Sequence, residues 1–600
     1  MKIILAVYLS FFFTVTVYSQ KLNPETTSYR YWIYFKDKGD YKPGDILEPG
    51  SEGYNLARSV LSEKAIWRRS KVLPQNLVVN YNDLPVNQEY IKYVEDCGVK
   101  YHAVSRWLNA VSIIATRKEL EKIRKLPFVS KIEGVGYLEF VRYHSRSNFT
   151  NTYTQPEGLR FNYGYSWWQN QQINVPVLHN YGITGYNVTV GMCDDGYNWR
   201  KHQALRTRKV LGEYDWIFKD DSTQYQLIPN QLQNDVWDQD GHGTATMSAL
   251  GGFYEGHIIG PAFDSEFYLS KSEYNGSETP VEEDYWLEAV EWMESRGAEV
   301  ISSSLIYKKF DLPHNQYSYK DMNGNTTIIV RAAEHAAGLG VVVLNSMGNE
   351  RQTNPPSIVS PGDGKNVIAV GAVDSSGRIA YFSSNGPTSD GRIKPDVVAM
   401  GVDVYTAVSY SSTWDTAGYT YSSGTSFSCP LTAGVCALIL SAHPYLTPDQ
   451  VREALKMTAD RRDNPDNVYG WGLINAYDAA LYWGMIASNR PFISVSDEGI
   501  IISIYFISRS KINTERVLFY YSTDGINYTS ARMELSEKIN ETNSGKYSYV
   551  LSNDIKLSDL KFYFYAEDEN TSRYAPYYAP RDFFYYNSEN NSIEIFQINP

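Results

Sequence analysis

The sequence predicts an α/β domain with a mostly parallel central sheet, preceded by a small α+β domain and followed by an all-β sandwich. Three observations support this fold class. Between about 160 and 485, near-continuous apolar strands alternate with helical patterns, as in a parallel sheet covered on both faces. Residues 30–135 alternate shorter strand and helix patterns. After about 488, aromatic or β-branched runs are separated by Asp-Gly and Asn-rich turns, which is typical of a sandwich.

The chain of 600 residues is too long for one hydrophobic core, and its first residues indicate export. Lys2 precedes an apolar run from Ile3 to Val17, and the small residues Val17 and Ser19 stand at the spacing for cleavage before Gln20. No later stretch approaches the length of apolar residues that a membrane span needs. We therefore expect a signal peptide at 1–19, a small domain with its linker at 20–150, the α/β domain at 155–486 and the sandwich at 488–600.

Composition excludes some classes of function. The net charge of -13 and the isoelectric point near 5.3 argue against a nucleic-acid footprint, which would be basic. The chain has four cysteines, too few for a disulfide framework. Cys429 and Cys436 are separated by roughly 10 Å along a predicted helix, too far for a bridge. We interpret these two, with Cys97 and Cys193, as small buried hydrophobic residues.

The small domain is expected to order its elements as strand, helix, strand, helix, strand. Apolar residues recur at helical spacing up to Gly98, which is a natural helix end. Thr116 and Glu119 form a capping box for the second helix, which ends before Pro127. The predicted elements are a strand at 31–35, a helix at 86–97, a strand at 107–115, a helix at 116–126 and a strand at 128–133.

In the α/β domain, strands are predicted from apolar runs and helices from periodicity and caps. The run "LTAGVCALIL" is apolar on all sides, so its helix should be buried. Thr447 and Gln450 form a capping box, with Pro448 at the first helical position. The expected strands are 186–193, 298–306, 341–348 and 365–373. The expected helices are 283–297, 326–340, 431–440 and 446–459.

Four short segments in this domain carry candidate catalytic residues: "GMCDDGYN" with Asp194, "DQDGHGTATMSALGG" with His242, "NSMGNE" with Asn349 and "SGTSFSCP" with Ser426. Loops at strand ends form the ligand side of an α/β sheet. Taken singly, each residue has an ordinary interpretation, as a turn or a helix cap. Together they supply a nucleophile, a base, a group that orients the base and an oxyanion donor, which peptide-bond cleavage requires.

With this combination, residues 160–485 resemble the subtilisin-like serine proteases, whose catalytic residues follow the order Asp, His, Ser. "CDDG", "GHGT", "MGNE" and "GTSFSCP" carry the resemblance, and "YFSSNGP", "KPDVVAMG" and "YGWGLINA" support it. It implies a subtilisin-like three-layer domain in which Asp194 orients the imidazole, and His242 acts as general base and then general acid. Ser426 would attack the scissile carbonyl, and Asn349 with the Ser426 N–H would bind the oxyanion.

The resemblance also implies how substrate binds. The stretch "SSSLI" resembles the family strand that pairs with an extended peptide. The stretch from Asn345 to Gly348 would form the opposite wall of the pocket. The expected substrate-binding residues are Ser302, Ser303, Ser304, Leu305, Met347 and Gly348.

Two positions depart from the family pattern. Asp195 stands where many relatives have Ser or Thr, although a second Asp also occurs in the kexin-like branch. The ordinary interpretation of Asp195 is a solvated or hydrogen-bonded turn residue. Ile306 replaces a glycine that is common in the pocket strand, so a narrower pocket is expected.

Residues 30–135 resemble the propeptides of this family, which assist folding and plug the active site; an ordinary extra domain is the alternative. The resemblance therefore implies a secreted serine endopeptidase, extracellular, periplasmic or at the cell surface, made as a precursor. Its partners would be polypeptide substrates and its own propeptide. The chemistry needs no cofactor. Calcium is frequent in the family, but no ligand set stands out, and Asp238 and Asp240 are interpreted as solvated. The competing hypothesis is a binding or adhesion protein on an inactive protease scaffold.

Overall fold

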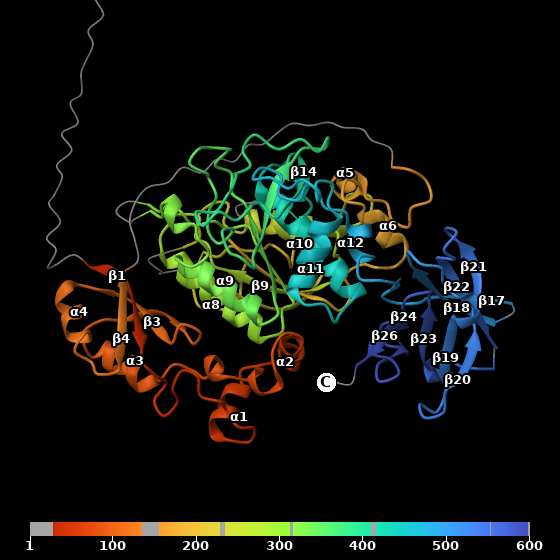
Figure 1. Ribbon diagram of the computed structural model, residues 1–600, viewed down its shortest axis with the longest axis horizontal. Helices are drawn as coiled ribbons and strands as arrows, with labels where there is room; N and C mark the ends of the chain where they lie inside the picture. The colour runs from red at the N-terminus through yellow and green to blue at the C-terminus, as the bar shows by residue number, and fades with distance from the viewer. Residues whose placement is uncertain are drawn as a thin grey trace, which may run out of the picture.

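The computed structural model describes residues 28–134, 155–227, 234–311, 316–409, 416–497, 499–552 and 554–597. Figure 1 shows three domains along the chain: a red to orange N-terminal domain, a central domain and a blue C-terminal domain. The expected signal peptide at 1–19 and most of the expected linker lie outside the described residues.

The N-terminal domain is a four-stranded antiparallel sheet in the order β2-β3-β1-β4, with helices on one face. Its strands are β1 (Tyr29–Phe35), β2 (Tyr101–Ser105), β3 (Ala110–Ala115) and β4 (Val129–Gly134). Ile33 points into the core beneath α3 (Gln88–Glu95) and α4 (Arg117–Ile123), while its neighbour Trp32 points to the opposite face, toward the central domain. The predicted capping box of Thr116 and Glu119 is present.

The sequence did not predict two α-helices and one strand of this domain. They are α1 (Glu52–Arg58), α2 (Glu63–Ser70) and β2. Apolar periodicity did not predict α2, because that helix buries Arg68 and Arg69 and its buried side therefore has no continuous apolar stripe.

The central domain contains a seven-stranded parallel sheet in the order β13-β12-β11-β10-β5-β9-β6, as the sequence predicts. The strands are β5 (Thr189–Asp194), β6 (Lys209–Asp215), β9 (Glu266–Lys271), β10 (Val300–Ser303), β11 (Val342–Ser346), β12 (Ile368–Val373) and β13 (Val397–Met400).

Helices cover both faces of this sheet, which makes three layers. Val341 and Val343 pack with α8 (Val281–Ser295) and α9 (Ile328–Gly338). Val342 and Leu344 point the other way, into a core that also contains side chains from α6 (Val175–Asn180) and from four further helices. Those helices are α7 (Gly241–Gly251), α10 (Thr425–Ala442), α11 (Pro448–Thr458) and α12 (Ala476–Ala480). The smaller elements are α5 (Trp167–Gln171), α6 (Val175–Asn180), β7 (Phe253–Tyr254), β8 (Ile258–Ile259), β14 (Val404–Ala407) and β15 (Tyr419–Ser422).

Helix α10 crosses the interior of the central domain. All its residues except Ser441 are buried, as its uniformly apolar sequence predicts. Among the described residues, α10 is the one helix that is long and apolar enough to span a bilayer. However, 89% of its apolar stretch is buried inside the protein. The capping box of the following helix, at Thr447 and Gln450, is also confirmed. All four cysteines are free and buried.

The C-terminal domain is built from two antiparallel sheets that face each other across an aromatic core. One sheet contains β16 (Ile486–Ala487), β17 (Phe492–Ser496), β18 (Gly499–Ile507), β21 (Glu534–Lys538) and β22 (Gly545–Leu551). The other contains β19 (Leu518–Ser522), β20 (Thr529–Arg532), β23 (Lys561–Glu567), β24 (Ser572–Ala575), β25 (Phe583–Asn587) and β26 (Ser592–Phe596). Phe506, Phe519 and Phe564 meet between them, as the alternating aromatic pattern predicts.

Shortening a side chain at the centre of α10 should destabilise the central domain. Leu438 is completely buried there, so Leu438→Ala should lower the free energy of unfolding by about 2–5 kcal/mol. Met457, on α11, is 42% exposed, and Met457→Ala should change it by less than about 0.5 kcal/mol. Urea unfolding followed by circular dichroism measures both, and equal midpoints for the two variants would contradict the buried placement of α10.

Candidate active site

Strand β5 ends at Asp194, whose carboxylate is almost fully buried and held by three donors. Thr246 Oγ1 donates to Asp194 Oδ2 over 2.9 Å, and the backbone N–H of Asp195 donates to Oδ1 over 2.9 Å. His242 Nδ1 lies 2.6 Å from the same Oδ1. Because the carboxylate can only accept, it fixes the neutral imidazole with its proton on Nδ1 and leaves Nε2 as the basic nitrogen.

His242 stands in the first turn of α7, and Asp195 caps that turn. The backbone N–H groups of His242 and Gly243 donate to Asp195 Oδ2 and Oδ1 over 3.2 and 2.7 Å. Asn275 Nδ2 also donates to Oδ2, over 2.8 Å. Burial, together with the neighbouring Asp194 carboxylate, raises the pKa of Asp195 to about 8. Asp195 is therefore a hydrogen-bonded turn residue that also positions the helix carrying the imidazole.

Ser426 is the second residue of α10, and its surroundings come from two other segments. Its carbonyl accepts a hydrogen bond from Ser304 Oγ over 2.9 Å. The ring of Phe427 lies 6.0 Å, centre to centre, from the ring of His242. The amino end of α10 thus sits beside the imidazole and next to the strand predicted to bind substrate.

Asn349 reaches the same helix end from the loop after β11. Its Oδ1 accepts from the backbone N–H and from Oγ1 of Thr425, each over 2.9 Å. Because both bonds use the oxygen, Nδ2 remains available as a donor. It lies close to Gly424, 3.5 Å from the position that a Cβ atom on that residue would occupy. An amide donor fixed next to the Ser426 loop has the geometry of an oxyanion site.

The catalytic candidates other than Ser426 open onto a cleft with a volume of about 390 Å³. Asp194, His242 and Asn349 line it, and so do Ser304, Leu305 and Ile306. Ile306, which stands where the family commonly has glycine, therefore faces the space where a peptide would lie.

The remaining predicted substrate residues lie behind this lining. Ser303 Oγ accepts from Trp286 Nε1 over 3.0 Å, and Ser302 Oγ lies 3.8 Å from Cys429 Sγ. Met347 packs in a small apolar cluster, and the Gly348 N–H donates to Thr425 Oγ1 over 3.2 Å. None of these four residues lines the cleft, and the side chains of Ser302, Ser303 and Met347 are engaged elsewhere.

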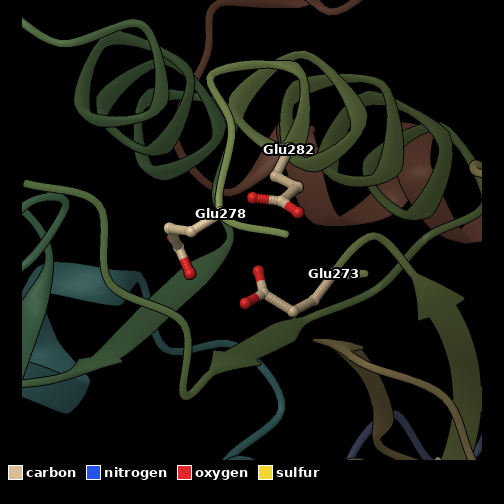
Figure 2. Close-up of side chains that lie close together, drawn as sticks. All are labelled: Glu273, Glu278 and Glu282. Atoms are coloured by element: carbon tan, nitrogen blue, oxygen red, sulfur yellow. The ribbon is translucent and has the colours of Figure 1, made fainter. Parts of the chain in front are cut away.

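Three glutamates at one end of the cleft point toward one another, as Figure 2 shows. Their carboxylate oxygens lie within 4.8 Å of one another, and Glu273 and Glu278 also line the cleft. The third, Glu282, is in the first turn of α8. Carboxylates suit a hard divalent cation, so among the described residues this group is the one that could hold one. Sequence reasoning missed it, although the acidic stretch "EYNGSETPVEED" was a signal.

The interpretation of Asp240 as solvated is wrong. Asp240 is 3% exposed, and its Oδ2 accepts from the Tyr225 backbone N–H over 2.9 Å. Burial raises the pKa of Asp240 to about 6. Asp238 lies in the lining of the cleft. The structural calcium ion stays a prediction.

Comparison with known proteins places this chain in a family. The model of the subtilase family matches residues 185–472. A subtilisin of Bacillus pumilus is 32% identical over 316 residues, which cover 52% of this chain and 96% of that protein. The chain belongs to the subtilase family. Serine protease AprX of Bacillus subtilis is 32% identical over 49% of this chain and 66% of its own length. Subtilisin E of Bacillus subtilis is 29% identical over 64% of the chain and 84% of its own length.

The N-terminal domain has its own match. The model of the peptidase S8 propeptide domain of Bacteroidota covers residues 30–152. The prediction of a propeptide is confirmed, and the ordinary extra domain is excluded. This subtilase is therefore a serine-type endopeptidase made as a precursor, with polypeptides as substrates and its own propeptide as a partner.

Replacing Asp195 should impair catalysis without removing any atom that touches substrate. Asparagine keeps the shape but offers one acceptor oxygen, so one of the three donors around it would face an NH₂ group. We expect Asp195→Asn to lower kcat/KM on the order of tenfold, the cost of one unsatisfied buried donor, and to change the pH profile near 8, where the carboxyl titrates.

Peptide hydrolysis measured from pH 6 to 10 tests this. Asp374 accepts comparable bonds from the N–H groups of Ser376 and Arg378 in an exposed turn, so Asp374→Asn is the matched control. A folded Asp195→Asn enzyme with the wild-type rate and profile would show that the cap does not position His242.

Proposed function

We propose that this subtilase is a secreted enzyme that cleaves polypeptides through Asp194, His242 and Ser426, with an acyl-enzyme intermediate. The observation that carries the proposal is the 2.6 Å contact between His242 Nδ1 and Asp194, made beside the amino end of the helix that bears Ser426. A binding protein on an inactive scaffold would have no need for this set of groups.

The geometry supports the following sequence of proton transfers. His242 Nε2 takes the proton of Ser426 Oγ as that oxygen bonds to the scissile carbonyl carbon. The carbonyl oxygen becomes an oxyanion, which the Ser426 N–H and Asn349 Nδ2 stabilise. His242 then gives the proton to the leaving amine as the C–N bond breaks, and water hydrolyses the acyl-enzyme by the same steps.

Substrate would lie along Ser304, Leu305 and Ile306 as an added strand, held by backbone hydrogen bonds. Ser302 and Ser303 would support that strand, and Met347 and Gly348 the opposite wall. Thr425 and Asn349 hold the two sides together at the reaction centre.

The location and domain limits complete the proposal. A signal peptide at 1–19 would direct export, followed by the propeptide and linker to 150, the catalytic domain at 155–486 and the β-sandwich from 488. The pairing of β16 with β18 supports a boundary close to 486. Structural calcium, if this enzyme shares it with its family, would serve stability.

A fluorophosphonate probe tests the nucleophile directly. The processed enzyme should be labelled, and Ser426→Ala should abolish labelling, because the probe reacts only with an activated hydroxyl. Ser428, two residues further along the same helix, donates to the Thr425 carbonyl, and Ser428→Ala is the matched control. Labelling that persists in Ser426→Ala would reject this serine as the nucleophile.

Removing the oxyanion donor should slow the chemical step while leaving binding intact. Asn349→Ala is expected to lower kcat by about 10²–10³ with little change in KM. Steady-state hydrolysis of a peptide substrate measures this, and an unchanged kcat would exclude Asn349 from the mechanism. Clearing of casein by the wild-type processed chain separates the enzyme from the inactive-scaffold hypothesis.

A further inference from the structure

The propeptide contacts α8 of the catalytic domain along most of its length. Trp32 Nε1 of its sheet donates to Asp284 Oδ1 over 2.8 Å, and the backbone N–H of Trp107 donates to Glu291 Oε1 over 3.4 Å. Helix α2 lies elsewhere, beneath the catalytic domain and on the side of the C-terminal domain (Figure 1). The N–H of Ser62, which caps α2, donates to the carbonyl of Ser295 at the last residue of α8 over 2.9 Å.

Arg68 of α2 is completely buried where α8 and α9 end. Its guanidinium donates to the carbonyls of Glu294 and Ala298 over 3.0 and 2.7 Å, and to the carbonyl of Leu339 over 3.2 Å. Carbonyls at helix ends lack partners within the helix, and a positive charge is favourable there. One propeptide side chain thus donates to carbonyls at or just after the ends of two catalytic-domain helices.

Arg69 is equally buried and shares a carboxylate with Arg68. Its Nε and Nη2 donate to the two oxygens of Glu294, each over 2.7 Å, and Arg68 pairs with the same side chain. Nη1 of Arg69 also reaches Asp83, within the propeptide, over 2.7 Å. Burial raises the pKa of Glu294, but the guanidinium groups of Arg69 and Arg68 outweigh it and hold that pKa at about 2. The pair is bidentate and dry, the geometry in which an arginine is most specific.

The same helix reaches the C-terminal domain. Trp67 meets the ring of Tyr578 edge-on at 6.4 Å, and Lys71 Nζ lies 3.7 Å above the Trp67 ring. Lys64 pairs with Glu299 of the catalytic domain over 3.2 Å. A cavity of about 310 Å³ lies at this junction and is lined by residues of all three domains.

We propose that α2 is a second docking element of the propeptide, in which Arg68 and Arg69 bind a receptor site formed by Glu294 and the carboxyl ends of α8 and α9. Tyr578 extends this receptor site onto the C-terminal domain. The partner is the chain's own propeptide, which the site retains after the linker has been cut. Arg68 and Arg69 must both leave Glu294 before the propeptide is released, so the α2 contact limits the rate of release.

Release of the propeptide can be measured without any catalytic activity. The full chain carries Ser426→Ala and a recognition sequence for an unrelated protease within 135–154, and is immobilised by a C-terminal tag after cutting. Arg68→Ala should speed release of the propeptide at least about tenfold, because it leaves a buried carboxylate short of a partner. Arg58, on α1, pairs only with Glu63 and Leu61 of the propeptide in the contacts described, and Arg58→Ala should release at the wild-type rate.

The receptor side gives a second, independent measurement. Glu294→Gln should speed release to a similar extent. The double variant Arg69→Ala with Glu294→Gln should release the propeptide no faster than the faster of the two single variants, because both changes break the same ion pair. Tyr578→Ala should speed release by about two- to tenfold, with Tyr574→Ala, on the exposed face of β24, as its control. Circular dichroism checks that each chain is folded. If the Arg68→Ala chain does not fold, the release rate of the Glu294→Gln chain tests the proposal instead. Release at the Arg58→Ala rate in the folded Arg68→Ala or Glu294→Gln chain would overturn the proposal.

Discussion

The structure depends on one buried carboxylate that must be satisfied by donors from its surroundings. Asp194 ends an interior strand of a parallel sheet, where water does not reach it. Its partners are the imidazole of His242, the hydroxyl of Thr246 and the next backbone N–H. Two of these belong to α7, so meeting the needs of the carboxylate also fixes the helix that carries the base. Stability and catalysis therefore require the same arrangement.

The other groups are held by the same means, through side chains that bond backbone rather than substrate. Asp195 caps α7 and accepts from Asn275, which ties the strand end, the histidine helix and the loop after β9 together. Thr425 and Asn349 connect the loop after β11 to the start of α10. Rigid helices and strands thus position groups that come from four distant parts of the sequence.

The fold and the catalytic candidates could be predicted because each leaves a local trace. Apolar runs marked the parallel strands, and short glycine-rich motifs marked Asp194, His242, Asn349 and Ser426. Helix α2 left no such trace, because its buried face is formed by Ala65 and two arginines that share a carboxylate, Glu294, more than two hundred residues away. The cluster of Glu273, Glu278 and Glu282 was missed for a different reason, because an acidic stretch in the sequence does not show that its carboxylates converge.

The chemistry of the α2 contact also explains how a strong interface can be temporary. The arginines that pair with Glu294, including Arg106 at 3.9 Å, all belong to the propeptide. When the propeptide leaves, Glu294 and the helix-end carbonyls are uncovered, and water replaces the lost donors. An apolar contact of the same strength would instead leave an exposed hydrophobic patch on the mature enzyme. Charge pairing therefore gives tight binding in the precursor and a soluble surface after release.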